Sequence, residues 1–273
     1  MNYYLKLILR AIALIGVLQL IQRLMSLSIL IITKRSSIFS VNFGKNEFLF
    51  EFTDKGAHKG GRGLYIFRDK IEKLLNYGNK FINEGDVCID GGANIGIYTL
   101  AFLSAVGNKG KVIAIEPMNY AVNEIKRLSS INNFKDPIVI EGALSNEEGN
   151  ASLDFSDGVG FGSIVRGFGG KETIEVKTYT IDEIVSREDL RSLDFIKLDI
   201  EGAELLALNG AIESIKKFRP KICLECERDR FEEITQFLID LKYKPYYFNN
   251  HGNFIEIKSY IMPHNQNQIF YIP

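Results

Sequence analysis

The sequence of 273 residues predicts an α/β protein with a doubly wound, mostly parallel sheet and antiparallel strands near its C-terminal end. Three observations predict this fold. Short apolar segments alternate with helix-length segments between residues 87 and 241, the first apolar segment ends in a glycine-rich turn, and residues 246–272 read as short antiparallel strands. Continuous apolar strands separated by helices indicate a parallel sheet covered by helices on both faces.

The individual elements follow from the same patterns. In chain order we expect strands at 87–90, 111–116, 138–141, 151–155, 174–177, 195–200 and 222–225, and helices at 95–105, 120–131, from 203 onward and at 231–241. Ahead of them, alternating apolar residues predict a hairpin at 40–53, and helical spacing predicts a helix at 69–81. We therefore divide the chain into a hydrophobic N-terminal helix (1–35), a hairpin and helix leading into the core (36–80), and a main domain (81–273).

Composition limits the classes of function. Hydrophobic residues make up 46% of the chain and charged residues 25%, which is enough to bury a large core. The 33 basic and 34 acidic residues nearly cancel, so no overall positive field attracts nucleic acid, and we expect no nucleic-acid partner. Three cysteines are too few for a disulfide framework and indicate a reducing compartment. Cys223 and Cys226 fall on opposite faces of an expected strand, which disfavours a shared redox or metal role.

The first 32 residues differ from the rest of the chain because Leu and Ile dominate them. Two apolar runs, 11–21 and 24–32, are separated by Gln22 and Arg23. A single helix of this length could span a bilayer with Arg23 in the hydrocarbon, or lie in the membrane interface at lower cost. Other interpretations are a cleaved signal peptide, for which no clean cleavage site precedes Lys34, and a helix packed on the main domain or on a partner chain.

A glycine-rich turn follows the first expected strand of the sheet. Its sequence is D-G-G-A-N-I-G, and the residues expected to bind a cofactor here are Asp90, Gly91, Gly92, Ala93, Asn94 and Gly96. Such a turn lets a ligand approach the backbone and the N–H groups of the following helix. Ala93 stands where the dinucleotide fingerprint needs its second glycine, so a nicotinamide-dependent oxidoreductase is disfavoured.

Carboxylates beside the turn indicate which cofactor it binds. Asp90 at the mouth of the turn would repel a pyrophosphate, whereas a sulfonium and an α-ammonium group are positive and would be favoured. Glu116, followed by Pro117, ends the next strand twenty residues after Gly96 and is placed to accept hydrogen bonds from ribose hydroxyls. Gly142 and Ala143 follow the third strand, where they would border an adenine. These features predict S-adenosylmethionine as the cofactor.

The region from residue 86 to about 220 resembles the FkbM family of methyltransferases. The resemblance is carried by the turn at 90–96, E-P at 116–117, A-L-S at 143–145, Y-T-I-D-E at 179–183, F-I-K-L-D-I-E-G-A-E at 195–204 and R-P at 219–220. It implies a class I methyltransferase fold, S-adenosylmethionine as donor, and oxygen methylation of sugars, polyketides or other small or glycan-like acceptors. The first 35 residues lie outside it.

Polar residues at the end of the fourth expected parallel strand, 195–200, are the candidates for chemistry. Ligands bind beyond the carboxyl ends of parallel strands, which is where Lys197, Asp199 and Glu201 lie. We expect Asp199 to be the base that takes a proton from an acceptor hydroxyl, Lys197 to position or polarise the acceptor, and Glu201 to hold it or act as a second acid. Alternatively, Lys197 only pairs with Asp199, and Glu201 and Glu204 only favour a helix N-terminus.

Some alternatives for the site stay open. We predict no metal, because spacing alone does not bring carboxylates together. A general-base role for His251 requires it to fold over the site, and residues 161–163 in a glycine-rich loop could either close over the acceptor or form a hairpin tip.

The expected function is transfer of a methyl group to a hydroxyl of a small-molecule, saccharide or lipid-linked acceptor. The alternative is a membrane-tethered, non-catalytic binding or scaffold protein. We expect a cytoplasmic protein, which residues 1–35 could attach to the cytoplasmic face of a membrane.

Overall fold

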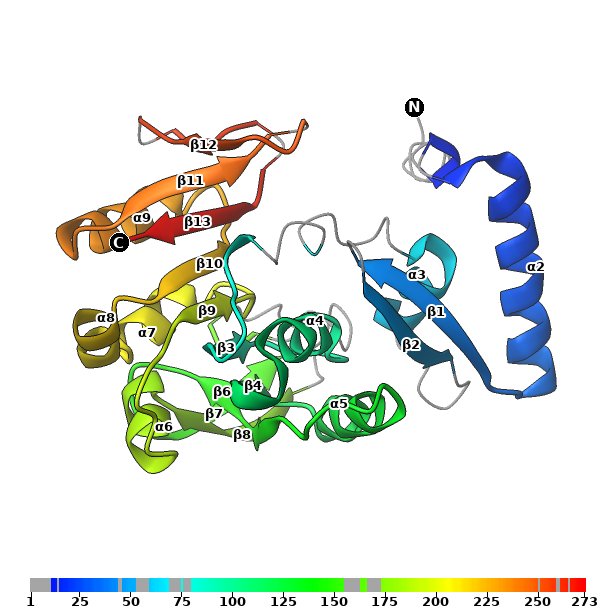
Figure 1. The fold of residues 1–273 in the computed structure, drawn as a ribbon, viewed down its shortest axis with the longest axis horizontal. Coiled ribbons are helices and arrows are strands. Elements are labelled where there is room, and N and C mark those ends of the chain that lie inside the picture. The colour runs from blue at the N-terminus through cyan, green and yellow to red at the C-terminus, as the bar shows by residue number, and fades with distance from the viewer. Residues whose placement is uncertain are drawn as a thin grey trace.

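The computed structural model describes residues 11–13, 15–43, 46–52, 59–68, 75, 80–154, 163–165, 173–249, 251–258, 261–264 and 266–273. In these residues the central sheet has eight strands, in the order β12-β11-β13-β10-β9-β3-β4-β5 (Figure 1). The strands are β3 (Val87–Gly91), β4 (Lys111–Glu116), β5 (Ile138–Glu141), β9 (Phe195–Leu198), β10 (Lys221–Glu225), β11 (Lys244–Phe248), β12 (Phe254–Glu256) and β13 (Gln268–Ile272).

The sheet is parallel from β5 to β10 and antiparallel beyond it. β4 pairs parallel with both β5 and β3, β9 pairs parallel with both β3 and β10, and β13 pairs antiparallel with both β10 and β11. The predicted fold class is therefore confirmed, including the antiparallel C-terminal strands. The strand order changes direction between β3 and β9, so the segments that follow these two strands leave the same edge of the sheet side by side.

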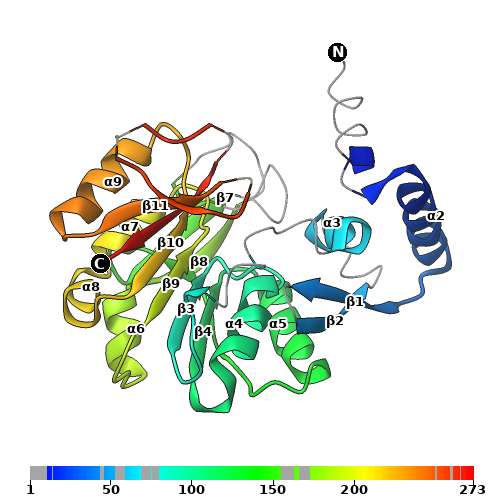
Figure 2. The same ribbon diagram turned by 45° about the horizontal axis from the view of Figure 1, so that its top comes forward.

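Helices cover both faces of the sheet (Figure 2). On one face lie α4 (Ile97–Val106) and α5 (Asn119–Ile131). The other face carries α6 (Ile181–Arg187), α7 (Glu204–Asn209), α8 (Ile212–Phe218) and α9 (Phe231–Asp240). Buried side chains such as Ile184, Leu208, Ile215 and Leu238 join these four helices to the sheet in one apolar cluster. Because both faces are covered, the strands of the sheet are almost wholly apolar.

A second sheet of three strands lies beside the main one. It has the order β6-β8-β7, with β6 (Ala143–Leu144), β7 (Gly149–Asp154) and β8 (Thr173–Tyr179). The strands expected at 151–155 and 174–177 are therefore present, paired antiparallel with each other. Most of the glycine-rich loop between them lies outside the described residues, except for 163–165.

The predicted hairpin is present as β1 (Ser37–Phe43) and β2 (Asn46–Phe52), which pair antiparallel. It docks on the helices of the main domain. The Asn46 side-chain amide donates to Ser104 Oγ of α4 at 2.9 Å, and Asn132 exchanges hydrogen bonds with the Leu49 backbone at 2.7 and 2.8 Å. Most of the helix expected at 69–81 lies outside the described residues.

The N-terminal hydrophobic segment forms α2 (Val17–Thr33), which packs against α3 (Lys59–Phe67) and the hairpin. The single hydrophobic helix expected within residues 1–35 is interrupted at Gly16, whose backbone has φ 79°. Arg23 donates a hydrogen bond to the Ile66 carbonyl, and Ser26 Oγ lies 2.8 Å from Tyr65 Oη. Among the described residues, no helix combines the length and the apolar character needed to cross a membrane.

Candidate active site

The turn after β3, residues 90–96, is built from unusual backbone conformations. Gly92, Asn94 and Gly96 all have positive φ, at 73°, 49° and 86°. A side chain at position 92 is sterically excluded, because a Cβ there would lie 1.9 Å from the Asp199 carbonyl oxygen. Gly92 therefore brings the backbone of this turn into direct contact with the segment that follows β9.

The turn leads into α4, whose N-cap is Gly96. A glycine N-cap has no side chain to accept hydrogen bonds from the N–H groups of the first helical turn, so these donors stay available to a ligand. The backbone N–H groups of Gly92 and Ala93 both donate to the Ile115 carbonyl of β4, at 3.0 and 3.1 Å. The turn is thus fixed to β4 of the sheet.

Asp90 lies beneath this turn and not at its mouth, the position expected from the sequence, since its side chain is fully buried. Thr99 Oγ1 donates to Asp90 Oδ2 at 2.6 Å, and the Lys197 ammonium lies 3.6 Å from Asp90 Oδ1. Desolvation by burial raises the pKa of Asp90, helped by the nearby Asp199 carboxylate and opposed by Lys197 and Thr99. Asp90 Oδ1 has no hydrogen-bond partner in the described part of the chain.

Lys197 joins Asp90 to Asp199. Its ammonium is also 3.4 Å from Asp199 Oδ2 and lies 4.4 Å from the centroid of the Tyr98 ring. The strand register explains this position, because Lys197 of β9 is paired with Asp90 of β3. Lys197 is buried and pairs with Asp199, as one of the two alternatives from the sequence holds, and it also pairs with a second carboxylate, that of Asp90.

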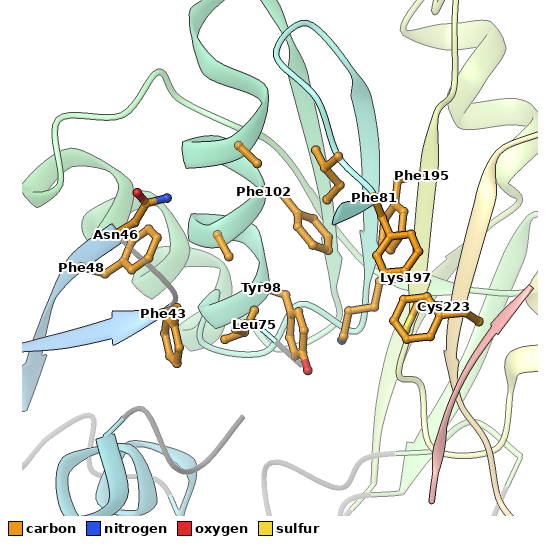
Figure 3. Close-up of a pocket in the computed structure, with 14 residues that line it drawn as sticks. Phe43, Asn46, Phe48, Leu75, Phe81, Tyr98, Phe102, Phe195, Lys197 and Cys223 are labelled. Atoms are coloured by element: carbon orange, nitrogen blue, oxygen red, sulfur yellow. The ribbon is translucent and has the colours of Figure 1, made fainter. Parts of the chain in front are cut away.

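Figure 3 shows how Lys197 reaches this position from an apolar neighbourhood. Its side chain extends from β9 toward Tyr98, among the rings of Phe81, Phe102 and Phe195. These side chains line a small cavity of about 30 Å³ between the hairpin, α4 and the sheet. The stem of the lysine packs in apolar surroundings while its ammonium meets the carboxylates.

Glu116 sits at the end of β4 and organises two backbone segments. Its Oε2 accepts from the Asn94 N–H at 2.8 Å, and its Oε1 accepts from the Met118 N–H at 2.9 Å. Desolvation raises the pKa of Glu116 to about 7, although both backbone hydrogen bonds oppose the shift. Each carboxylate oxygen has two lone pairs, so each keeps one acceptor for a ligand hydroxyl.

The loop after β9, residues 199–203, is supported from several directions. Glu201 has φ 51° and Gly202 has φ 96°. The Glu204 carboxylate accepts from the backbone N–H groups of Ile200 and Gly202, at 3.3 and 3.1 Å. Burial raises the pKa of Glu204. This arrangement supports a structural role for Glu204 as the residue that shapes the loop.

Two more side chains contact this loop. Arg230, at the start of α9, donates to the Gly202 carbonyl at 2.8 Å. Ser163 Oγ, from the glycine-rich loop after β7, donates to the Glu201 carbonyl at 2.7 Å. The described part of the glycine-rich loop therefore touches the β9 loop, and Ser163 also pairs with Asp154 of β7 in an antiparallel bridge.

A cleft of about 520 Å³ opens beyond the carboxyl ends of β9 and β10. Its charged lining is mostly acidic and consists of Asp199, Glu201, Glu204, Glu225, Glu227, Asp229 and Arg228. The guanidinium of Arg228 donates to the Met262 and Pro263 carbonyls at 2.9 and 3.2 Å. In the residues that the structure describes, no group of three or more His, Cys, Asp or Glu side chains could hold a metal ion.

The other residues singled out in the sequence lie as follows. Gly142 donates its N–H to the Glu116 carbonyl at 3.1 Å, and Ala143 begins β6 beside it. Pro117 is partly buried directly after β4. His251 is exposed and does not belong to the described residues that line the cleft.

Sequence reasoning missed Tyr98, Thr99 and Arg230. The sequence does mark Tyr98 and Thr99, because α4 reads I-Y-T-L-A-F-L-S-A-V and has few polar side chains. A tyrosine and a threonine in the first turn of such a helix, directly after a glycine-rich turn, are candidates to hold a buried charge. No local pattern marks Arg230, whose partner is 28 residues away in the chain.

The fold and this site define a class I methyltransferase type of protein: the strand order, the glycine-rich turn after β3 and the acidic residue ending β4 all agree with it. Comparison with known proteins assigns the family. The methyltransferase FkbM domain matches residues 90–245, more than half of the chain, and the chain belongs to this family. The resemblance noted over residues 86–220 is confirmed and extends to the start of β11.

Individual relatives are distant. Methyltransferase sdnD from Sordaria araneosa is 24% identical over 180 residues, which cover 54% of this chain and 67% of the relative. A crystal structure of methyltransferase FkbM from Methylobacillus flagellatus KT matches 78% of this chain with 18% identity and a TM-score of 0.47, and this chain covers 54% of that one. A SAM-dependent O-methyltransferase from Thermotoga maritima matches 86% of this chain and 77% of its own, with 14% identity and a TM-score of 0.40.

Proposed function

We propose that this protein transfers the methyl group of S-adenosylmethionine to a hydroxyl oxygen of a small-molecule, saccharide or lipid-linked acceptor. The observation that carries the proposal is the position of Asp199. Its carboxylate contacts the buried Lys197 ammonium on one side and lines the acidic cleft on the other, with 30% of its side chain exposed. A carboxylate in this position can reach an acceptor while it stays linked to the glycine-rich turn.

The donor would lie against the turn at 90–96 and Glu116. Asp90 and Asp199 flank this region and both pair with Lys197, and Glu116 adds a third carboxyl group. This charge balance favours a positively charged ligand over a pyrophosphate. S-Adenosylmethionine supplies a methyl group activated by a positive sulfonium. Glu116 would accept the ribose hydroxyls, and Gly142 and Ala143 would border the adenine.

The acceptor would occupy the cleft. Carboxylates accept hydrogen bonds from hydroxyl groups, and the acidic lining opposes the phosphate backbone of a nucleic acid. Asp199 would take the hydroxyl proton as the oxygen becomes a nucleophile. Lys197 would orient Asp199, and Glu201 would hold a neighbouring hydroxyl.

Donor binding is tested by calorimetry on the full chain with S-adenosylmethionine and S-adenosylhomocysteine. We expect micromolar binding of both. Absence of binding by a demonstrably folded chain would overturn the proposal and leave a non-catalytic protein that retains the fold. With binding established, labelled S-adenosylmethionine and a panel of free saccharides identify the methylated atom. A label found on nitrogen or carbon would contradict oxygen transfer.

The base is tested by Asp199→Asn. General-base catalysis contributes about 10²–10⁴-fold, so we expect kcat to fall by at least about 100-fold while the donor still binds. Asp229→Asn is the matched control, because Asp229 lines the same cleft from the β10–α9 connection. We expect it to alter KM for the acceptor and to leave kcat within about threefold of wild type. Equal kcat values for the two variants would remove Asp199 from the chemistry.

A further inference from the structure

Helix α2 exposes a continuous apolar face to the outside of the molecule. The side chains of this outward face are spaced to fall on one side of the helix, and each is 43–80% exposed. They are Val17, Leu18, Ile21, Leu24, Met25, Ile29 and Ile32. Figure 1 shows α2 at the edge of the molecule, with α3 and the hairpin on its inner side. A helix of 17 residues is about 26 Å long, so these side chains form a contiguous apolar patch. Single exposed apolar residues are common on protein surfaces, but a patch of this length is not.

The orientation of α2 is fixed by contacts on its inner side. Leu20 and Leu27 are the buried residues of the helix, and Leu27 packs against Phe52 and Tyr65. The hydrogen bonds of Arg23 and Ser26 lie on this same side. Because the inner side is occupied by the protein itself, the outward face remains for an external partner.

The outward face is also free of unsatisfied polar groups. Ser28 lies within it, and its hydroxyl donates to the Leu24 carbonyl at 2.8 Å. At the C-terminal end, the Thr33 hydroxyl donates to the Ile29 carbonyl at 2.7 Å. A helix in surroundings that offer no hydrogen-bond partners needs its hydroxyl groups to bond to its own backbone carbonyls, as these two do.

Charge distinguishes between possible partners. Residues 1–35 contain five basic residues, Lys6, Arg10, Arg23, Lys34 and Arg35, and no acidic residue, whereas the remaining residues carry 28 basic against 34 acidic. Lys34 and Arg35 are exposed at the C-terminal end of α2. A second copy of this segment would bring like charges together with no carboxylate to pair them. An anionic lipid surface would attract them.

We propose that the outward face of α2 lies on an anionic lipid surface, with the helix axis in the plane of the membrane. The apolar side chains enter the boundary between headgroups and acyl chains, and Lys34 and Arg35 contact the anionic headgroups. The contacts of the inner side hold the rest of the protein on the water side. This proposal does not depend on the identity of the methyl donor or acceptor.

The test is cosedimentation of the full chain with vesicles of phosphatidylcholine alone and of phosphatidylcholine containing phosphatidylglycerol. We expect binding to the anionic vesicles that weakens in high salt, and weaker binding to the neutral vesicles. Met25→Glu with Ile29→Glu should lower the partition coefficient by at least about tenfold. Leu18→Gln with Ile32→Gln removes the two ends of the face without adding charge and should act in the same direction.

The matched control is Ile255→Glu with Ile261→Glu, two exposed isoleucines near the C-terminus at 36% and 73% exposure. We expect this variant to bind vesicles as the wild type does. The proposal is overturned if the wild type binds neither type of vesicle, or if the control loses as much binding as the Met25 and Ile29 variant. The proposal is also overturned if the wild type forms a dimer in the absence of lipid and the Met25 and Ile29 variant is monomeric. The outward face would then be a contact between subunits. Equal thermal midpoints of the variants would show that folding is intact.

Discussion

The turn after β3 and the loop after β9 lie at the same edge of the sheet but are built differently. The β3 turn fixes its shape through backbone conformation, and its acid, Asp90, is fully buried. The β9 loop is supported by Glu204 and Arg230 and exposes Asp199 and Glu201 to a cleft. This difference fits the roles proposed above, in which the β3 turn positions the donor and the β9 loop presents polar groups to the acceptor.

The two segments are also coupled, by the contact of Gly92 with the Asp199 carbonyl and by Lys197. Gly92→Ala should break this coupling most severely. A Cβ at 1.9 Å from a backbone oxygen, added to a φ of 73°, should lower the free energy of unfolding by about 2–6 kcal/mol. Denaturant unfolding followed by circular dichroism measures the change.

Gly85→Ala separates steric overlap from backbone strain. Gly85 also has positive φ, at 94°, but a Cβ there meets no atom within 4 Å. We expect a loss of about 1–2 kcal/mol from strain alone. Equal losses for the two variants would show that the contact between the turn and the β9 loop does not constrain position 92.

Lys197→Met should have the next largest effect. It leaves Asp90 buried without a cation, and breaking a buried pair in this way costs about 3–5 kcal/mol. The pKa of Asp90 should rise further, so the variant should regain stability as the pH falls. Combining it with Asp90→Asn should restore most of the loss. Lys177→Met, at an exposed position of β8, is the control and should stay within about 0.5 kcal/mol of wild type. A loss in Lys197→Met that Asp90→Asn does not relieve would refute the pairing.

Glu116 gives a smaller effect than Lys197, and its sign follows from its pKa. The pKa is about 7 in the folded protein and 4.5 as the reference value, so the folded state holds the proton more tightly. This contribution to stability is present below pH 4.5 and is lost as the pH rises to about 7. The difference in free energy of unfolding between wild type and Glu116→Gln should therefore change by about 2–3 kcal/mol across this range. A difference independent of pH would contradict the raised pKa.

Sequence patterns located the elements of the main sheet because its strands are continuously apolar and its turns carry glycine. They did not locate the break between α7 and α8, where Gly210 stands too close to the Ser145 carbonyl oxygen to carry a side chain. This break depends on a contact between residues far apart in the chain. The separation of β6, β7 and β8 into their own sheet has the same kind of cause, since sheet membership is decided by pairing partners.

For the candidate site, the sequence identified the acidic residues but not their surroundings. Asp90 was expected at the mouth of the turn and is buried under it, because the register of β3 with β9 places Lys197 beside it. A register across strands joined by about a hundred residues is not encoded by local spacing. The link from Asp90 through Lys197 to Asp199 therefore became visible only in three dimensions.

The position of β13 has a consequence for biosynthesis. This strand lies between β10 and β11, both of which precede it in the chain, and its residues Ile269, Phe270 and Tyr271 are almost completely buried. Until residues 268–272 have emerged from the ribosome, β10 and β11 each keep an unpaired edge that could join another chain. A nascent chain that ends before residue 268 would thus be a target for chaperones rather than a smaller folded protein.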